Sequence, residues 1–296
     1  MRFLRFTPKG TTEELIGILS KDEKKVFDLN FFELGKMYSS IQEIIEHFND
    51  VELKEIKNLL AGELDGLGKY DIEDVKILPP LKRTIHDIIC AGFNYADHLK
   101  EIKKDSSNKV VNSVYFSKRS TKMIGQDGEI DGHLDLDPAL DYEVELAVII
   151  GKKGYKIKAE DAEEYIFGYT IMNDISARGL QGKYRQWFIG KSLDTFTSIG
   201  PVIVYKDELK MPFDLEISSY VNGELRQSSN TNLMITNIRD MIAELSQGIT
   251  LEPGDIISTG TCSGVGVGFK PPKYMKSKDI VECKIERIGT LRNIVK

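Results

Sequence analysis

The alternation of apolar and polar positions along the chain predicts many short strands and few helices. Runs of about four to eight apolar or β-branched residues, bounded by glycine, proline or charged residues, are typical of strands. After the first 80 residues we expect strands at Ile85–Ala91, Val114–Phe116, Glu143–Ile150, Phe167–Met172, Pro201–Tyr205, Leu215–Val221, Asp255–Thr259 and Asp279–Ile285. In the same region we expect helices at Tyr95–Glu101, Ala159–Tyr165 and Thr236–Leu245.

Two short turn signals support this assignment. Asn222-Gly223 in "VNGE" is typical of a two-residue hairpin. Pro253-Gly254 in "LEPGD" predicts a type II turn. The strands and helices do not alternate regularly, which disfavours a Rossmann fold or a TIM barrel. We therefore expect an α+β fold that is mainly β, with a mixed sheet.

The first 75 or so residues predict a small α/β unit of their own. Ser40 and Glu43 have the spacing of a capping box, which indicates that a helix begins there. Pro79 and Pro80 suit a junction, because proline restricts the residue before it to extended conformations. We expect a small domain at 1–78 and a larger domain at 79–296. Its predicted strands are Arg2–Phe6, Leu15–Leu19 and Lys25–Leu29, and 51–60 is a second predicted helix.

Composition narrows the class of protein. The 296 residues are 41% hydrophobic and 29% charged, which is ordinary for a soluble globular chain. The net charge of −6 and the lack of a long Lys/Arg block argue against a nucleic-acid partner. No apolar run approaches the ~20 residues that span a bilayer, and no signal peptide is evident. Cys90, Cys262 and Cys283 are widely spaced, which argues against disulfides and zinc and predicts a cytoplasmic protein.

Three carboxylates form a candidate metal site. Glu143 and Glu145 are two residues apart, so in a strand they point the same way. The usual interpretation is an exposed edge strand, but the apolar run "LAVII" that follows predicts a strand covered on both faces. Asp174, at the end of another apolar run, is either a third ligand or a turn residue. Three carboxylates without His or Cys select a hard cation such as Mg²⁺ or Mn²⁺.

Cations and hydroxyls could hold an anionic substrate beside such a metal. Lys118 and Lys191 follow apolar or small-residue stretches, although an exposed head on a buried stem is the commoner arrangement for lysine. The loop 258–268 is rich in glycine and includes Thr261. Its backbone N–H groups could hold an anionic oxygen, or the loop could be a tight connection only.

One histidine has an acidic partner. His98 and Glu101 are three residues apart on a predicted helix, so their side chains can meet. A glutamate beside a histidine fixes the tautomer and raises the basicity of the ring, which suits a general base. The alternative is an ion pair on the surface of a short helix.

Taken together and in order, these motifs resemble the fumarylacetoacetate hydrolase family. The likeness covers about residues 80–296. It is carried by "GFNYADHLKE", "YFSKRS", "DYEVELAVIIGKKG", "GYTIMNDISAR", "GKSLDTFTSIGPVIV", "VNGELRQ", "LEPGDIISTGT" and "IERIGTL". The chain departs from the family pattern at Arg119, Gly179 and Cys262, where Pro, Asp and Pro are common.

The resemblance implies a fold and a site. The family's catalytic domain is a mixed β-sheet roll, usually a homodimer, with a divalent metal that is generally Mg²⁺, while Mn²⁺ or Ca²⁺ could also fit. The residues that match are Glu143, Glu145 and Asp174 as metal ligands, Lys191, Lys118 and Thr261 as substrate-binding residues, and His98 with Glu101 as a dyad on a lid helix. Lys191 is expected to be catalytic as well, because it would share the negative charge on the keto oxygen.

The resemblance also implies a reaction class. A 2-oxo acid would chelate the metal and pass through an enolate. The His98–Glu101 pair favours hydrolysis of a C–C bond in an acylpyruvate or fumarylpyruvate. Isomerisation of a 2-hydroxyhepta-2,4-diene-1,7-dioate and decarboxylation of oxaloacetate are alternatives. A dicarboxylate binder without turnover and a Ca²⁺-stabilised structural protein are the non-enzymatic alternatives.

Overall fold

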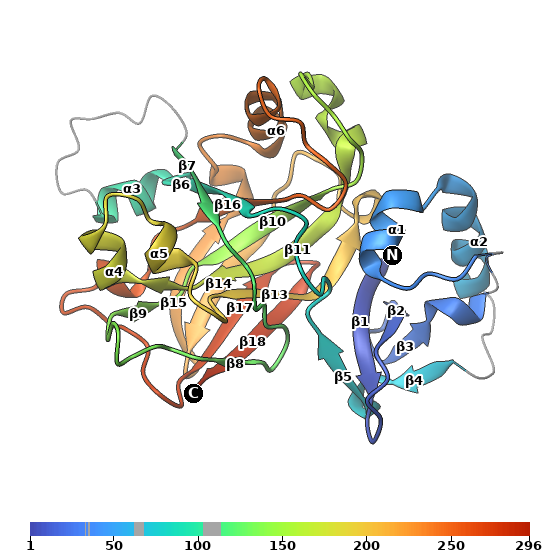
Figure 1. Ribbon diagram of the computed structural model, residues 1–296, viewed down its shortest axis with the longest axis horizontal. Coiled ribbons are helices and arrows are strands. Elements are labelled where there is room, and N and C mark those ends of the chain that lie inside the picture. Colours follow the sequence, from blue (N-terminus) through green and yellow to red (C-terminus); the bar gives the residue numbers. More distant parts are fainter. Residues whose placement is uncertain (33, 35, 62–67, 103–113) are drawn as a thin grey trace.

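One 11-stranded sheet runs through the computed structural model (Figure 1). The structure describes residues 1–32, 34, 36–61, 68–102 and 114–296. Along the sheet the order is β4 (Lys69–Asp71), β3 (Lys25–Asp28), β2 (Leu15–Leu19), β1 (Arg2–Pro8), β13 (Thr197–Tyr205), β11 (Ile166–Asp174), β10 (Val144–Ile150), β16 (Ile256–Thr261), β6 (Ile88–Gly92) and β7 (Val114–Lys118), with β5 (Val75–Leu78) paired to β1.

A second sheet packs against the first. Its order is β15 (Glu224–Asn230), β14 (Glu216–Val221), β17 (Ile280–Ile285), β18 (Gly289–Val295) and β8 (Glu129–Ile130). A two-strand pair joins β9 (Leu140–Asp141) to β12 (Ser176–Ala177). Most pairings are antiparallel, but β16 with β6 and β18 with β8 are parallel. The predicted mainly β architecture with mixed sheets is confirmed.

The helices are short and lie around the sheets. They are α1 (Ile41–His47), α2 (Asp50–Ala61), α3 (Ala96–Ile102), α4 (Arg178–Lys183), α5 (Phe188–Lys191) and α6 (Ile238–Ser246). The 3₁₀ turns are η1 (Leu29–Phe32), η2 (Ile72–Asp74), η3 (Ala159–Tyr165), η4 (Lys206–Glu208), η5 (Thr231–Leu233) and η6 (Gly266–Gly268). No helix in these described residues is long and apolar enough to cross a membrane.

Most predicted local signals hold. The Ser40 hydroxyl accepts a hydrogen bond from the Glu43 N–H at 3.1 Å and begins α1. Asn222 and Gly223 both have positive φ in the turn between β14 and β15. The helix predicted at Ala159–Tyr165 is instead 3₁₀. Only Ala162 is buried there, so no apolar stripe supports a full α-helix.

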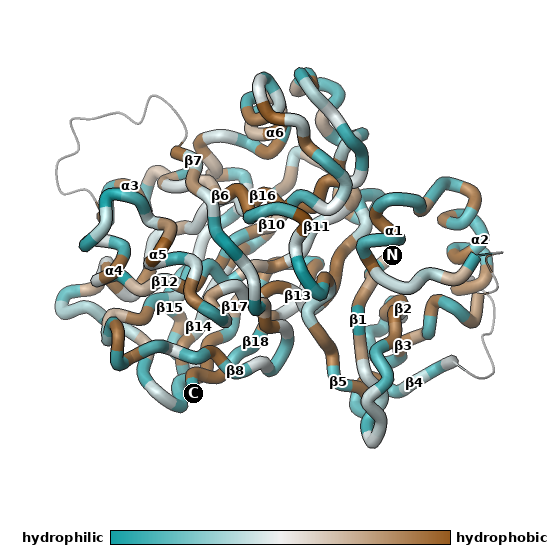
Figure 2. Tube along the Cα trace, viewed as in Figure 1, coloured by the Kyte–Doolittle hydropathy of each residue, from teal (hydrophilic) through white to brown (hydrophobic). Residues whose placement is uncertain are grey.

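The central strands are buried on both faces. Every residue of β10 and β11 is buried, as expected for strands covered on both sides. Val144, Leu146 and Val148 pack into a core shared with the second sheet. Ala147 and Ile149 pack on the other face with apolar side chains of the N-terminal region. Figure 2 shows apolar residues gathered on these central strands and hydrophilic residues on the outer turns.

The N-terminal unit belongs to the same 11-stranded sheet as the rest of the chain. β1 pairs antiparallel with β13, and Phe3 lies opposite Ile203. In Figure 1 the unit forms a lobe that joins the remainder of the molecule at this pair of strands. The domain boundary at 78/79 remains a prediction. The backbone hydrogen bonds between β1 and β13 join residues on its two sides.

Candidate active site

The three predicted carboxylates lie together where two buried strands meet. β10 begins beside the end of β11, with Val144 opposite Asn173. This register places Glu143 and Glu145 next to Asp174, the last residue of β11. One ligand atom from each lies within 4.8 Å of the others, and all three side chains are buried. The predicted cluster is therefore present, and the exposed edge-strand alternative is wrong.

Both predicted lysines are buried beside Asp174. The Lys191 Nζ lies 2.7 Å from Glu143 Oε2 and 2.6 Å from Asp174 Oδ2. The Lys118 Nζ lies 2.6 Å from Asp174 Oδ1 and donates to the backbone oxygens of Ile175 and Lys191. The alternative of an exposed head on a buried stem is wrong for both lysines. Lys191 lines the cavity described below, whereas Lys118 lies behind Asp174 and is absent from the cavity wall.

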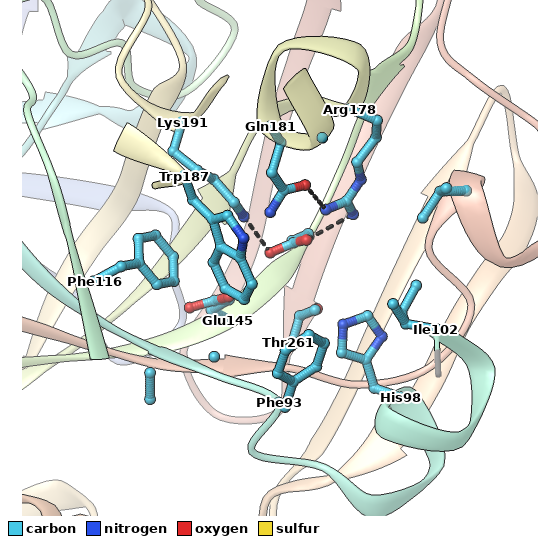
Figure 3. A pocket seen from close by; sticks show the side chains of 15 residues that line it. Phe93, His98, Ile102, Phe116, Glu145, Arg178, Gln181, Trp187, Lys191 and Thr261 are labelled. Atoms are coloured by element: carbon cyan, nitrogen blue, oxygen red, sulfur yellow. Dashed lines mark hydrogen bonds and ion pairs between the residues drawn. The ribbon is translucent and has the colours of Figure 1, made fainter. Parts of the chain in front are cut away.

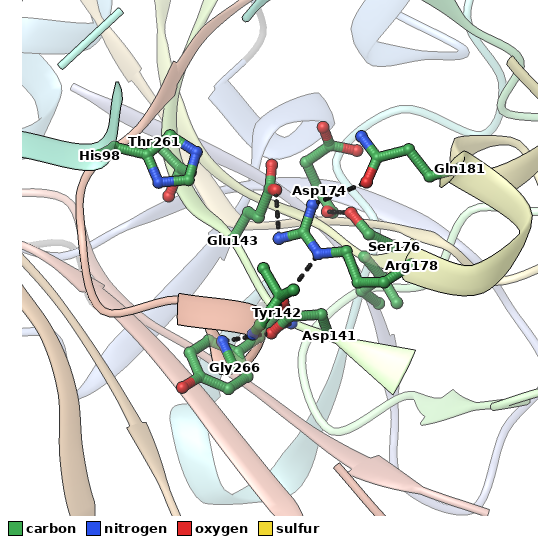
Figure 4. A network of polar contacts seen from close by, with 12 residues as sticks. His98, Asp141, Tyr142, Glu143, Asp174, Ser176, Arg178, Gln181, Thr261 and Gly266 are labelled. Carbon is green, nitrogen blue, oxygen red and sulfur yellow. Dashed lines mark hydrogen bonds and ion pairs between the residues drawn. The ribbon is translucent and has the colours of Figure 1, made fainter. Parts of the chain in front are cut away.

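Arg178 is a charged neighbour to which sequence analysis gave no role. Its Nη2 lies 2.6 Å from Glu143 Oε1 and its Nε lies 2.7 Å from Asp141 Oδ2. Its Nη1 donates to the Gln181 side chain at 3.0 Å. Figure 4 shows Arg178 at the centre of this network. The signal that could have found it is its place in "NDISAR", four residues after Asp174.

The burial of these charges shifts their pKa values in opposite directions. Burial would raise the pKa of Glu143, but Lys191 and Arg178 hold it well below its ordinary value. Burial, and then the charges of Asp174 and Glu143, raise the pKa of Glu145 well above its ordinary value. Burial lowers the pKa of Lys118 despite Asp174. For Lys191, Asp174 and Glu143 overcome burial and raise the pKa.

The donor set fits a divalent cation. Glu145 accepts from the Ser258 hydroxyl at 2.5 Å and from the Gly260 N–H at 3.0 Å. Within the described part of the chain, no basic side chain lies within ion-pair distance of Glu145. Its carboxylate is therefore the member of the cluster that most needs a positive charge. Three clustered oxygen donors match the preference of Mg²⁺ or Mn²⁺.

A cavity of about 310 Å³ opens beside this cluster (Figure 3). Its polar residues include Glu143, Glu145, Arg178, Lys191 and His98. Its other lining residues are Ala91, Gly92, Phe93, Ile102, Phe116, Gln181, Gly182, Trp187, Thr261 and Val267. The cavity thus combines a charged floor with aromatic walls, which is typical of a small-molecule site.

The predicted His98–Glu101 pair lies at the edge of this cavity on α3. The two side chains approach to 3.2 Å, from Nδ1 to Oε2. His98 is only 5% exposed, and its ring stacks on Phe93. The Glu101 carboxylate also accepts from the Gly264 N–H, at 3.0 and 3.2 Å. The alternative of a surface ion pair is therefore wrong.

The glycine-rich loop holds anionic oxygens, but they belong to the chain itself. Gly260 donates to Glu145, Gly264 to Glu101, and Gly266 to Asp141. Thr261 lines the cavity, yet its hydroxyl donates to the Val144 carbonyl at 2.9 Å and accepts from Gln227 at 2.7 Å. Its proton is already used, so this structure leaves it only an acceptor role toward a ligand.

The three departures from the family pattern lie away from the cavity wall. Arg119, Gly179 and Cys262 are not among its lining residues. Arg119 pairs with Asp87 at 3.3 Å in an exposed position. A Cβ at Gly179 would lie 2.8 Å from the Asp137 carboxylate, so a side chain there would require Asp137 to move.

Two relatives with the same named activity align with nearly the whole chain. The chain is 43% identical over 284 residues to an oxaloacetate tautomerase of Bacillus subtilis, covering 95% of this chain and 93% of that protein. It is 40% identical over 299 residues to a mitochondrial oxaloacetate tautomerase of Rattus norvegicus, covering 100% of this chain and 91% of that protein.

Solved structures share the fold along the whole chain. A fumarylacetoacetate hydrolase from psychrophilic Exiguobacterium antarcticum superposes with a TM-score of 0.84 at 38% identity, covering 100% and 99% of the two chains. A maleylpyruvate hydrolase from Sphingobium, solved with manganese(II) and pyruvate, gives 0.77 at 26% identity, covering 100% and 98%. The model of the fumarylacetoacetate hydrolase C-terminal domain matches residues 87–296. This chain belongs to the fumarylacetoacetate hydrolase family of enzymes.

Proposed function

We propose that this protein is a metal-dependent enzyme that enolises a small 2-oxo acid, and that its reaction is the keto–enol tautomerisation of oxaloacetate. The carrying observation is the pairing of two features in one cavity. Glu143 and Glu145 of the buried carboxylate cluster line its floor, with Asp174 next to them, and His98, backed by Glu101, lies on its wall. A cation held by the carboxylates would stabilise an enolate oxygen. The His98–Glu101 pair can take a proton from carbon or return it.

Glu143, Glu145 and Asp174 would hold the cation, with Mg²⁺ as our first choice and Mn²⁺ or Ca²⁺ as alternatives. When bound, it supplies positive charge that favours the enolate form of the 2-oxo acid. The manganese(II) and pyruvate in the structure of the related maleylpyruvate hydrolase support this choice of ligand and metal class.

The residues of the chain then divide the work. Arg178 and Lys191 supply positive charge on the cavity wall, which favours an anionic substrate and orients its carboxylate. His98 takes the proton from C3 of the keto form, and the enolate oxygen takes a proton from solvent to complete the enol. In the reverse direction the enol O–H gives its proton to solvent and the ring nitrogen of His98 returns a proton to C3. Glu101, 3.2 Å from Nδ1, fixes the orientation of the ring. The aromatic side chains Phe93, Phe116 and Trp187 limit the water that reaches the enolate.

The relatives favour tautomerisation over the hydrolysis that the dyad alone suggested. Two full-length relatives, at 43% and 40% identity, are oxaloacetate tautomerases. Tautomerisation needs a proton shuttle but no attacking water, so His98 and Glu101 serve either reaction. C–C hydrolysis of an acylpyruvate or fumarylpyruvate is the second candidate, supported by the same dyad. Isomerisation of a diene-dioate and decarboxylation of oxaloacetate follow from the same enolate. A homodimer in the cytoplasm remains a prediction.

The experiment is a substrate panel with one matched control. The wild-type protein, His98→Asn and His47→Asn are assayed with Mg²⁺ on enol-oxaloacetate, an acylpyruvate and a 2-hydroxyhepta-2,4-diene-1,7-dioate. His47 is an exposed histidine on α1 outside the cavity. We expect tautomerisation by the wild type, a loss of about 10²–10⁴-fold in His98→Asn, and no change in His47→Asn. No wild-type acceleration of oxaloacetate tautomerisation would refute the proposal, and acylpyruvate cleavage instead would establish the second candidate.

A further inference from the structure

Asp141 is a buried carboxylate that the reaction described above does not use. It ends β9, has no exposed surface, and does not line the cavity. Its Oδ1 accepts from the N–H groups of Gly266 at 2.6 Å and Tyr142 at 2.9 Å. Its Oδ2 accepts from the Val267 N–H at 3.0 Å and from Arg178 Nε at 2.7 Å. Both oxygens are thus committed to donors that come from two different parts of the site.

One arm of these contacts leads to the proton-transfer residues. Gly266 and Val267 belong to the loop whose Gly264 N–H donates to both oxygens of Glu101. A Cβ on Gly268 would lie 2.1 Å from Glu101 Oε1, so the glutamate is seated directly against this loop. Whatever fixes the loop therefore fixes Glu101 and, through it, the ring of His98.

The other arm leads to the carboxylate cluster. Arg178 joins Asp141 to Glu143, at 2.7 Å and 2.6 Å respectively. Without Asp141, the Arg178 guanidinium would still pair with Glu143 through Nη2, but its Nε–H would lose its acceptor. Figure 4 shows this continuous path from the Gly266 loop through Asp141 and Arg178 to Glu143.

We propose that Asp141 is a positioning residue that joins the two halves of the active site, the His98–Glu101 pair and the carboxylate cluster. This role of Asp141 rests on the enolisation proposed above. The way Asp141 positions the loop does not depend on which substrate is enolised. Asparagine cannot replace it, because an amide NH₂ would face either Arg178 Nε–H or backbone N–H groups, which are all donors. Asp141→Asn therefore breaks at least one arm while it keeps the size of the side chain.

The first test is a double-mutant cycle between Asp141→Asn and Glu101→Gln. We expect Asp141→Asn to lower kcat/KM about 10–100-fold, the usual cost of losing a residue that orients active-site ligands. If Asp141 acts through the loop that seats Glu101, the double variant loses much less than the product of the single losses. Losses that simply multiply would overturn the proposal.

Asp255→Asn is the matched control. Asp255 is also a buried aspartate that accepts a backbone N–H, from Glu252 at 2.7 Å, and pairs with a basic side chain, His86. It lies outside the cavity wall and is not linked to the loop 264–268 by any hydrogen bond described here. Combined with Glu101→Gln, it should give losses that multiply.

The second test is amide hydrogen exchange, which needs no turnover. We expect exchange in peptides covering 262–268 to be at least about tenfold faster in Asp141→Asn than in the wild type, with no such change in Asp255→Asn. Unchanged exchange in Asp141→Asn would overturn the proposal. If the wild type fails to tautomerise oxaloacetate, the proposed function fails while this measurement still decides the role of Asp141.

A second variant protects the test against a failure to fold. A Cβ at Gly266 would lie 2.6 Å from Asp141 Oδ1 and 2.6 Å from the Lys273 carbonyl, so Gly266→Ala disturbs the loop arm and leaves the Arg178 arm in place. If Asp141→Asn does not fold, Gly266→Ala takes its place in the double-mutant cycle and in the hydrogen-exchange measurement. The results that would support or overturn the proposal are the same.

Discussion

At the scale of single residues, Lys118 shows how burial changes the role of a side chain. The family resemblance predicts Lys118 as a substrate-binding residue. Its Nζ is instead occupied by the Asp174 carboxylate and two backbone oxygens, and its side chain has no exposed surface. A buried ammonium with complete local partners stabilises its surroundings rather than a ligand, so we expect Lys118 to hold Asp174 and the end of α5 in place.

Replacing Lys118 should therefore affect stability strongly. Lys118→Met removes one partner of a buried ion pair and leaves the Asp174 charge with Lys191 alone. We expect a loss of about 3 kcal/mol in the free energy of unfolding, measured by urea denaturation without added metal. Lys153→Met is the control, because Lys153 forms an exposed pair with Glu252 and should cost less than about 1 kcal/mol. Equal effects of the two substitutions would contradict this role.

The sequence predicted the carboxylates better than their partners. Glu143, Glu145 and Asp174 could be predicted because strand periodicity and the position of strand ends are visible in the local sequence. The partners of Arg178 and Lys118 lie 37 and 57 residues away along the chain, at Asp141 and Ile175. Local patterns carry no information about such contacts, which depend on the register between strands.

At the scale of elements, four aromatic rings join the N-terminal unit to the catalytic sheet. Phe3 of β1 contacts Phe48, Phe167 and Tyr205, with ring centroids 5.4, 5.6 and 6.3 Å apart. Phe167 belongs to β11 and Tyr205 to β13, so the cluster lies directly over the β1–β13 pairing. The two units are consequently expected to unfold together.

Truncating this cluster tests that expectation. Phe3→Ala should lower the free energy of unfolding by about 3–5 kcal/mol, because it removes a fully buried ring and leaves a cavity. Phe31→Ala is the control, since Phe31 is 54% exposed and should change stability by less than about 0.5 kcal/mol. Fluorescence and far-UV circular dichroism should report one transition in both proteins. Separate transitions would show that the units are independent.

A surface histidine just before β6, His86, gives a pH-dependent contact with Asp255, the residue before β16. The hydrogen bond between His86 and Asp255, with the charges of Asp255 and Glu252, outweighs partial burial and raises the pKa of His86. A raised folded-state pKa means that the stabilisation is complete below the unfolded value of about 6.5. It is then lost as pH rises through the higher folded value.

The expected result is a stability that falls between about pH 6 and the folded pKa of His86. Measured by thermal unfolding across this range, His86→Gln should show a smaller fall than the wild type. His133→Gln is a control histidine with no carboxylate partner among the described contacts of its ring. An identical pH dependence in wild type and His86→Gln would refute the contribution of this pair.

At the scale of the whole molecule, the fold explains how a charged carboxylate cluster comes to be buried. The cluster lies at one end of β10 and β11, which the second sheet covers on one face, while N-terminal apolar residues such as Phe3 cover the other face near the far end, at Phe167. The sequence predicted the mainly β architecture and most strands. It did not predict that β1 would extend the catalytic sheet, because proline-marked junctions indicate a boundary but not how strands pair across it.

The central claim is that enolisation depends on a cation held by Glu143, Glu145 and Asp174. The most direct measurement is the rate of enol-to-keto conversion of oxaloacetate, followed by absorbance, in chelator-treated protein titrated with Mg²⁺ or Mn²⁺. We predict that chelation abolishes the enzymatic rate and that either cation restores it, whereas Glu143→Gln/Glu145→Gln stays inactive and binds no Mn²⁺ by electron paramagnetic resonance. A full rate in the chelated wild type, or an unchanged rate in the double variant, would contradict the claim.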